Sequence, residues 1–147
     1  MENCMREVFA LSFLMTRKWE VFFNRMTEKG DLSLKQLMLL IVVGNMGKEP
    51  TIKEVSGILA TSHQNVRALL NQLEKKDFVS TYSDEKDKRI TRIKLKEGKE
   101  AYWAQRNDRD MKLIESLFEE LPIEDIQVTA KTLMALDEIA TKKIKHD

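Results

Sequence analysis

The sequence predicts a mainly α-helical fold that contains one small β-hairpin, with further helices on both sides. Two short helices with clear start signals follow each other between Thr51 and Gln72. Directly after them, two segments of β-type pattern flank a polar loop. Two closely joined helices followed by such a hairpin are typical of a winged helix-turn-helix, which is the fold class that we predict.

The length and composition suit one continuous protomer, residues 1–147, that buries a real core. Hydrophobic residues make up 42% and charged residues 33%, which is typical of a helix-rich soluble protein. The longest apolar run, Leu37–Val43, is too short to span a bilayer, and the N-terminus lacks a secretory signal pattern. We therefore expect a cytoplasmic protein without membrane contact.

Residue types that build metal and catalytic sites are scarce. Cys4 is the single cysteine, and only His63 and His146 stand beside it as further candidate zinc ligands. A usual zinc ligand set cannot be assembled from them, so we expect no structural metal and no cofactor. No Gly-rich phosphate loop and no nucleophile with an obvious base is present, so we predict that the chain is not an enzyme.

The first helix is predicted over about Cys4–Thr27, with Gly30 ending it, because apolar residues recur there at three- and four-residue steps. A second helix begins at Ser33, which forms a capping box with Gln36, and it stops near Gly44.

Thr51 and Glu54 repeat the capping-box spacing, which predicts a third helix over roughly Ile52–Leu59. Gly57 lies inside this helix, and we expect close backbone packing to explain it. Ser62 caps a fourth helix whose inner face carries Val66, Leu69, Leu70 and Leu73.

The hairpin is predicted from Phe78–Tyr82 and Ile90–Leu95, with Asp84–Lys88 as its loop. In the second strand, alternate residues form a packing face of Thr91, Ile93 and Leu95 and a cationic face of Arg92, Lys94 and Lys96. The net charge of the chain is only +1, but from Lys86 to Lys96 six basic residues face one acid, a local excess of +5. Such a concentration favours a nucleic-acid partner.

Residues 33–96 would thus form the DNA-binding region. After Gly98 a long helix reaches about Leu121, and Pro122 opens a last one. The terminal regions, 1–30 and 98–147, carry more apolar surface than so small a unit could cover, so we expect dimerisation helices there. A purely intramolecular core is the alternative.

The fourth helix has the residues that a DNA-recognition helix needs. Amides can pair with adenine edges, an arginine can fork onto guanine or phosphate, and residues at the helix start can reach the backbone. The candidates in these roles are Gln64 and Asn65, then Arg67, then Ser62 and His63. An ordinary solvated helix face is the alternative.

In the hairpin, Arg89 is the first choice for a minor-groove contact, with Asp87 orienting it through a charge-assisted hydrogen bond. Lys88, Arg92 and Lys94 are candidate phosphate contacts. Merely solvated turn charges are the alternative.

The chain resembles the MarR family of bacterial winged-helix regulators. The resemblance rests on the order and spacing of Leu32–Leu37, Val55–Leu73, Leu73–Lys76 and Asp87–Lys88–Arg89. It implies a homodimeric transcriptional regulator on a palindromic operator of double-stranded DNA. We expect a repressor, although repression or activation depends on where the operator lies relative to a promoter. Asp77 stands where the family usually has glycine, and Leu95–Gly98 is shorter than the family's stretch, which affects the junctions of the wing.

The resemblance also implies a small-molecule effector in a cleft beside the dimerisation helices. Trp19, Phe22, Met38, Met46 and Trp103 are the candidate lining residues. Plain core positions are the alternative for each of them. Some relatives sense peroxide through a reactive N-terminal cysteine, which invites comparison with Cys4. We favour the alternative that Cys4 has no redox role.

A protein-protein docking module without direct DNA binding is the alternative function, since Gln64 and Arg67 could also meet a protein surface. Steep salt dependence would indicate DNA.

Overall fold

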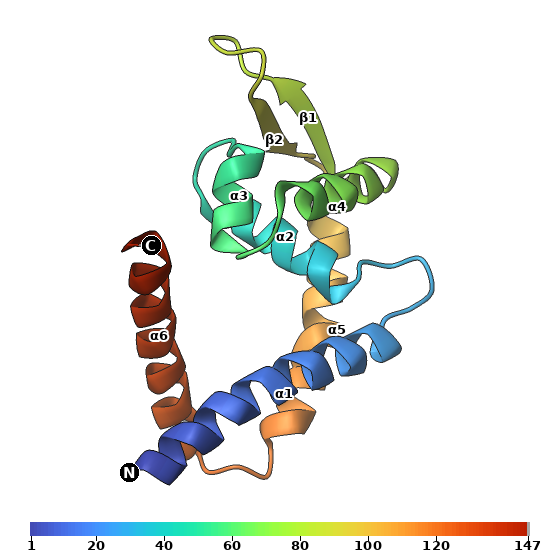
Figure 1. The fold of residues 1–147 in the computed structure, drawn as a ribbon. Helices are drawn as coiled ribbons and strands as arrows, with labels where there is room; N and C mark the ends of the chain where they lie inside the picture. The colour runs from blue at the N-terminus through green and yellow to red at the C-terminus, as the bar shows by residue number, and fades with distance from the viewer. Residues whose placement is uncertain (147) are drawn as a thin grey trace. The chain divides into compact units, whose positions relative to one another are not determined.

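The computed structural model describes the backbone of residues 1–146 and the side chains of residues 1–144. Its elements are α1 (Glu2–Met26), α2 (Leu34–Asn45), α3 (Ile52–Ile58), α4 (His63–Lys75), β1 (Val79–Ser83), β2 (Thr91–Leu95), α5 (Glu100–Phe118) and α6 (Ile123–His146). Contacts divide the chain into two compact units, Met1–Glu97 and a second that begins at Gly98. The predicted mainly helical fold with one hairpin is confirmed (Figure 1).

The helix starts follow local capping chemistry. Ser33 accepts from the backbone of Gln36, and the Gln36 side chain accepts from the Ser33 backbone, so the predicted capping box of α2 is confirmed. Thr51 and Glu54 form the second predicted box, at α3. Each box satisfies two backbone donors that the first turn of a helix leaves without partners.

The first helix agrees with the predicted range, about Cys4–Thr27, to within two residues, but Gly30 does not end it. The C-cap of α1 is Thr27, whose backbone is extended at φ −81° and ψ 133°. Gly30 therefore lies in the connection to α2, where its φ of +92° is one that glycine adopts without strain.

The core of the first unit lies where α2, α3, α4 and the hairpin meet. It contains fully buried Leu39, Val55, Val66, Leu73 and Ile93, with Leu32, Leu40, Val43, Ile52, Leu70, Phe78 and Val79 around them. The predicted inner face of α4 is confirmed at three positions, whereas Leu69 is only half-buried.

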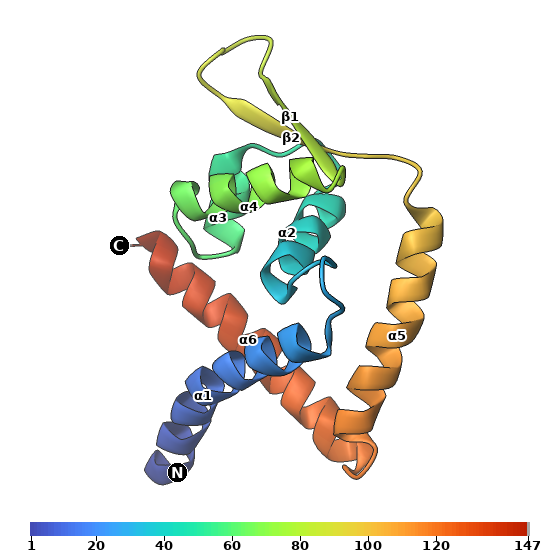
Figure 2. The same cartoon turned by 90° about the vertical axis from the view of Figure 1, so that its right-hand side faces the viewer.

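The hairpin is antiparallel, with Thr81 paired to Ile93, and it projects from the helical part of its unit (Figures 1 and 2). A short segment before α3 extends it, because Thr51 bridges Arg92 and the Ile93 amide donates to the Pro50 carbonyl at 2.9 Å. The wing is therefore tied at its base to the entrance of α3.

Helix α3 ends in a Schellman motif without glycine. The Thr61 amide donates to the Ser56 carbonyl at 3.1 Å and the Ala60 amide to the Gly57 carbonyl at 3.4 Å. These are the two bonds that define the motif, and its C′ residue is Ala60, at φ +48°. Our expectation for Gly57 is wrong, since a Cβ there would meet nothing within 4 Å.

Helix α4 ends in the same way. The Phe78 amide donates to the Leu73 carbonyl at 2.9 Å, the Asp77 amide to the Glu74 carbonyl at 3.0 Å, and Asp77 has φ +59°. Asp77 thus adopts the left-handed conformation that glycine would supply, which keeps the junction of the wing intact despite the departure from the family pattern.

In the second unit, α5 ends at Phe118, three residues before the predicted Leu121, and α6 starts directly after Pro122 with Glu124 and Asp125 in its first turn. Acidic side chains there favour the start of a helix. No helix within residues 1–146 is apolar over a sufficient length to cross a membrane.

Candidate nucleic-acid interface

The outward face of α4 carries polar side chains that the fold leaves uncommitted. His63, Gln64 and Arg67 are exposed, and among residues 1–144 their side chains have no hydrogen bond or ion pair. Val66, Leu70 and Leu73 are buried on the opposite face and fix the rotation of the helix. A rigid inner face and a free polar outer face are what a helix needs in order to read base edges.

Two candidate residues at the start of α4 form hydrogen bonds within the protein. Ser62 is the N-cap, and its hydroxyl accepts from the Asn65 amide at 3.2 Å. The Asn65 side chain donates to the Thr61 hydroxyl at 3.0 Å, across the turn between the two helices. Ser62 and Asn65 are both exposed. A contact of these two residues with DNA stays a prediction.

The outward face extends further than the sequence candidates suggested. Gln64 begins a row at helical spacing that continues through Ala68, Asn71 and Lys75, all of them exposed. The i+4, i+7 and i+11 spacing could have identified this row from the sequence, but a small apolar residue and a late lysine were not counted as candidates.

The tip of the hairpin presents Arg89 as predicted. Its Nε and Nη2 donate to the two carboxylate oxygens of Asp87 at 3.1 and 3.2 Å, and its backbone amide donates to Asp87 Oδ1 at 3.0 Å. These hydrogen bonds lower the pKa of Asp87. The Arg89 side chain is nonetheless 91% exposed, so its guanidinium group is oriented by Asp87 and remains accessible to a partner.

The predicted cationic face of β2 is largely neutralised, which corrects the sequence interpretation. Arg92 pairs with Asp84, Lys94 with Glu49 at 3.6 Å, and Lys96 with Asp77 at 3.9 Å. With the Arg89 pair, four of the six basic residues from Lys86 to Lys96 have acidic partners. Three of those acids, Asp84, Glu49 and Asp77, lie outside residues 86–96 in the sequence, and the fold brings them into contact with that segment.

Arg92 attaches the wing to the segment before α3. It donates to Asp84 and, at 2.9 Å, to the Glu49 carbonyl, and so joins the loop of the hairpin to the segment before α3. The hydrogen bond from Arg92, helped by the Lys86 and Asp87 amides, lowers the pKa of Asp84 to about 2. A phosphate contact by Arg92 or Lys94 stays a prediction, because each already has a partner in the protein.

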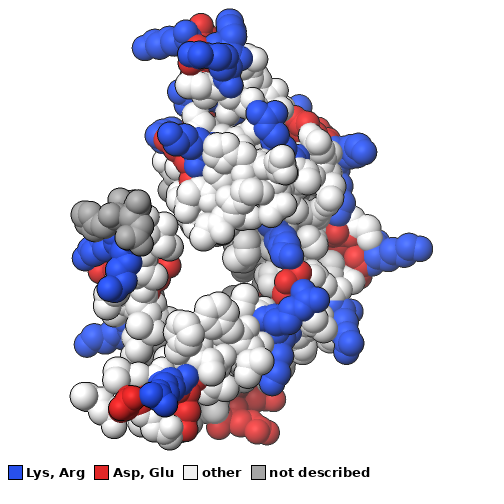
Figure 3. Space-filling view, viewed as in Figure 1, with Lys and Arg blue, Asp and Glu red and all other residues white. Residues whose placement is uncertain are grey.

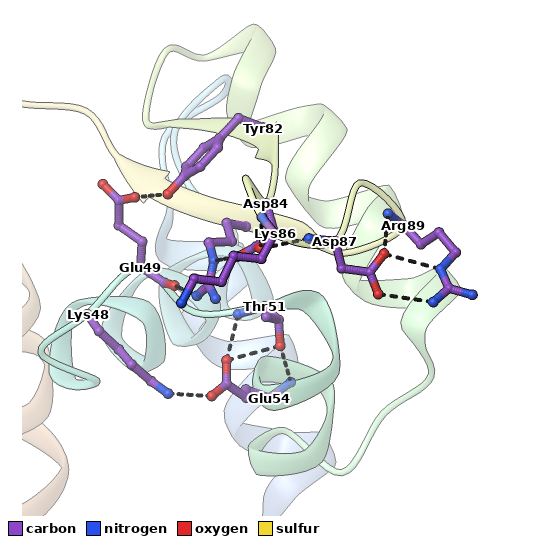
Figure 4. A network of polar contacts seen from close by, with 10 residues as sticks. Lys48, Glu49, Thr51, Glu54, Tyr82, Asp84, Lys86, Asp87 and Arg89 are labelled. Carbon is purple, nitrogen blue, oxygen red and sulfur yellow. Dashed lines mark hydrogen bonds and ion pairs between the residues drawn. The ribbon is translucent and has the colours of Figure 1, made fainter.

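Glu49 collects further bonds at the same place. Tyr82 donates its hydroxyl to the Glu49 carboxylate, and this bond raises the pKa of Tyr82. On α3, Lys48 and the Thr51 amide donate to Glu54 and lower its pKa to about 2 (Figure 4). The base of the wing is therefore a network of paired charges.

Within the wing, the basic side chains that have no ion pair among the described residues lie at the tip. Lys86 and Lys88 are exposed, and among the described side chains neither forms an ion pair. Lys and Arg side chains gather over the end of the hairpin, at the top of the view, with a few acidic atoms between them (Figure 3). The available cationic surface of the wing is thus its tip rather than its second strand.

The candidate effector residues lie on several elements. Phe22 lines a shallow hollow of about 280 Å³ on α1, together with Arg17, Lys18, Val21 and Arg25. Of the others, Met38 is 39% exposed on α2, Trp19 and Met46 are half-buried, and Trp103 belongs to the second unit. Their role in ligand binding stays a prediction.

Comparison with known proteins gives one family-model match and a set of similar folds. The model described as "MarR family" matches residues 30–90. No curated protein matches the sequence.

Three solved structures illustrate the similarity. FabT of Streptococcus pneumoniae in complex with DNA has a TM-score of 0.66 and 20% identity, over 94% of this chain and 98% of that one. A MarR mutant from E. coli complexed with operator DNA has a TM-score of 0.75 and 19% identity, over 91% and 96%. Bordetella bronchiseptica BpsR, described for the regulation of its DNA binding by 6-hydroxynicotinic acid, has 0.75 and 16%, over 88% and 98%. The chain therefore has the fold of these regulators.

Proposed function

We propose that the chain is a transcriptional regulator that binds double-stranded DNA, a proposal that starts from the match of residues 30–90 to the MarR family model. The observation that carries the proposal is the pairing of two surfaces on one unit. These are the uncommitted polar face of α4 and the exposed, carboxylate-oriented Arg89 at the wing tip. The first suits the major groove, and the second suits a narrow minor groove.

In the mechanism that we propose, the two surfaces have different tasks. Gln64 and Arg67 on α4 pair with base edges and choose the sequence. Arg89, Lys86 and Lys88 at the wing tip neutralise phosphates or enter the minor groove and supply affinity. The helix start at Ser62 directs backbone amides at the phosphate backbone.

We propose that the regulator is a homodimer on a pseudo-palindromic operator. Support comes from apolar side chains that are more than half exposed within the single chain. They include Phe9, Phe13 and Leu14 on α1 and Val128, Leu133 and Met134 on α6. So much exposed apolar surface is uncommon on monomers. Analytical ultracentrifugation should give a dimer at micromolar concentration, and a monomer there would refute this part.

Repression, and release by a small effector, complete the proposal. A regulator whose site overlaps a promoter blocks transcription, and an effector that displaces the dimer restores it. The hollow on α1 offers three cationic side chains beside Phe22 and Val21, which suits an aromatic or aliphatic anion. To test the effector, such anions are titrated into the complex with DNA, and we expect DNA binding to be lost. In Phe22→Ala this loss should require a higher concentration of the anion.

The test of DNA binding is selection of bound fragments from genomic DNA, followed by affinity measurements across salt concentrations. We expect half-site centres about 10 base pairs apart and a steep fall of affinity with salt. Arg89→Ala should weaken binding to many sequences alike, whereas Gln64→Ala should change the preference among sequences. Flat binding to duplexes at low salt would refute DNA recognition and favour a protein docking module in its place.

A further inference from the structure

Gln36 is a buried polar side chain that belongs to more than its capping box. It lies in the first turn of α2 and is only 4% exposed. Its Oε1 accepts from the Ser33 amide and from Lys76 Nζ, both at 3.1 Å, while its Nε2 donates to Gln72 Oε1 at 2.7 Å. Since the Ser33 amide and the Lys76 ammonium can only donate, they fix the orientation of the Gln36 amide.

Both long-range partners of Gln36 lie at the end of the candidate recognition helix. Gln72 is in the last turns of α4, and Lys76 is the C-cap of that helix. Lys76 Nζ also donates to the Asp31 carbonyl at 2.7 Å, in the connection between α1 and α2. The end of α4 is therefore held by directional bonds to the first turn of α2 and to the segment just before it.

The same turn of α2 is bonded to α1. The Leu34 amide donates to Asn24 Oδ1 at 2.9 Å, and Lys35 pairs with Glu20 at 3.0 Å. Asn24 and Glu20 both lie in the C-terminal half of α1. A continuous polar route thus runs from α1 through the start of α2 to the end of α4, and Gln36 is the buried residue at which it reaches α4.

We propose that Gln36 is a positioning residue that fixes the direction of α4 relative to α1. The inference rests on the proposed function, in which α1 contributes to the dimer and two copies of α4 read two half-sites. Apolar contacts such as those of Leu70 and Leu73 are non-directional and tolerate small rotations of a helix. A satisfied buried polar network selects one arrangement. Gln36 therefore sets the half-site separation that the dimer accepts.

The test measures preference for separation rather than affinity alone. Synthetic duplexes carry two copies of the half-site recovered by the genomic selection, with their centres at the natural separation or one base pair closer or further apart. For Gln36→Met and for Gln72→Met, we expect the affinity ratio between the best and worst separation to fall by about three- to tenfold. Gln72 is exposed, so its variant tests the route even where Gln36→Met folds poorly.

Ser56→Ala is the matched control. Ser56 is also a buried polar residue, 4% exposed, but its hydroxyl donates only within α3, to the Lys53 carbonyl at 3.0 Å. A loss of folded protein lowers binding to all duplexes in proportion and leaves the ratio unchanged, which is the result expected for Ser56→Ala. An unchanged ratio in both Gln36→Met and Gln72→Met would overturn the inference.

A second readout needs no DNA. Spin labels at Ala68→Cys, in a Cys4→Ser background, report the distance between the two α4 helices of a dimer. Gln36→Met should broaden this distance distribution and Ser56→Ala should not; equal widths would overturn the inference. A wild-type chain that dimerises but binds no duplex refutes the proposed DNA function alone, while the widths still decide the role of Gln36. A monomeric wild-type chain refutes the proposed homodimer and, with it, the role of Gln36, while DNA binding by the single chain is still decided by the affinity measurements.

Discussion

Gly57 and Ala60 each occupy a position that suits the other at the end of α3. Gly57 is helical and exposed, where alanine is the better residue. Ala60 is the C′ residue of the Schellman motif at φ +48°, where glycine is the better residue. We predict that exchanging them, as Gly57→Ala with Ala60→Gly, stabilises the protein.

The size of the effect follows from the backbone. A left-handed conformation costs an L-residue roughly 1–2 kcal/mol, which Ala60→Gly removes. Gly57→Ala alone should gain up to about 1 kcal/mol, because the new Cβ meets nothing within 4 Å. The exchange leaves the composition of the unfolded chain unchanged, so the entropy difference between glycine and alanine cancels. A net gain of about 1–2 kcal/mol remains.

Urea unfolding at a fixed protomer concentration measures this gain, since the stability of a dimer depends on concentration. The melting temperature should rise by about 2–4 °C per kcal/mol in a chain of this size. Ala68→Gly is the control, because Ala68 is exposed within α4 and its loss should cost about 1 kcal/mol. An unchanged or lower midpoint for the exchange would refute the assignment of strain to Ala60.

Three further predictions concern the wing and α4. In Arg92→Lys, the lysine cannot bond to both Asp84 and the Glu49 carbonyl, so the attachment of the hairpin is weakened. The Ile93 amide should then exchange its hydrogen at least about tenfold faster. Lys86→Ala is the control and should leave that exchange rate unchanged. The pKa of Asp84 is lowered from 3.8 to about 2, so the stability it contributes is complete above about pH 4 and lost as the pH falls towards 2; Asp84→Asn should flatten the stability curve in that window, and an identical slope would refute the pairing. On the proposed function, Lys75→Ala should reduce the salt slope of DNA binding by about one for all sequences alike, and a change of preferred sequence would contradict a phosphate contact.

The sequence was most informative where the chemistry is local. The capping boxes of α2 and α3 and the Ser62 cap involve residues three positions apart, so their spacing alone predicted them correctly. The buried stripe of α4 followed from helical periodicity. The Asp87–Arg89 pair, two residues apart in one loop, is likewise predictable from the sequence.

What the sequence did not reveal depends on contacts between distant segments. Arg92 looked like a free cation because Glu49 stands 43 residues away and becomes its neighbour only in the fold. Gln36 looked like an ordinary capping residue, since nothing local indicates that its amide also reaches Gln72, 36 residues later. The charge count over Lys86–Lys96 failed for the same reason, because a linear window omits the acids that the fold brings to it.

The contrast between the paired base of the wing and its unpaired tip separates two properties that mutation otherwise changes together. Exchanging Lys86 or Lys88 alters the charge offered to a polyanion and breaks no bond between these side chains and the other side chains that the structure describes. Exchanging Arg92 or Asp84 loosens the attachment of the hairpin before any effect on a partner can be expressed. Evolution, or a protein engineer, can therefore adjust how strongly this chain holds its target one charge at a time, with folding left as it is.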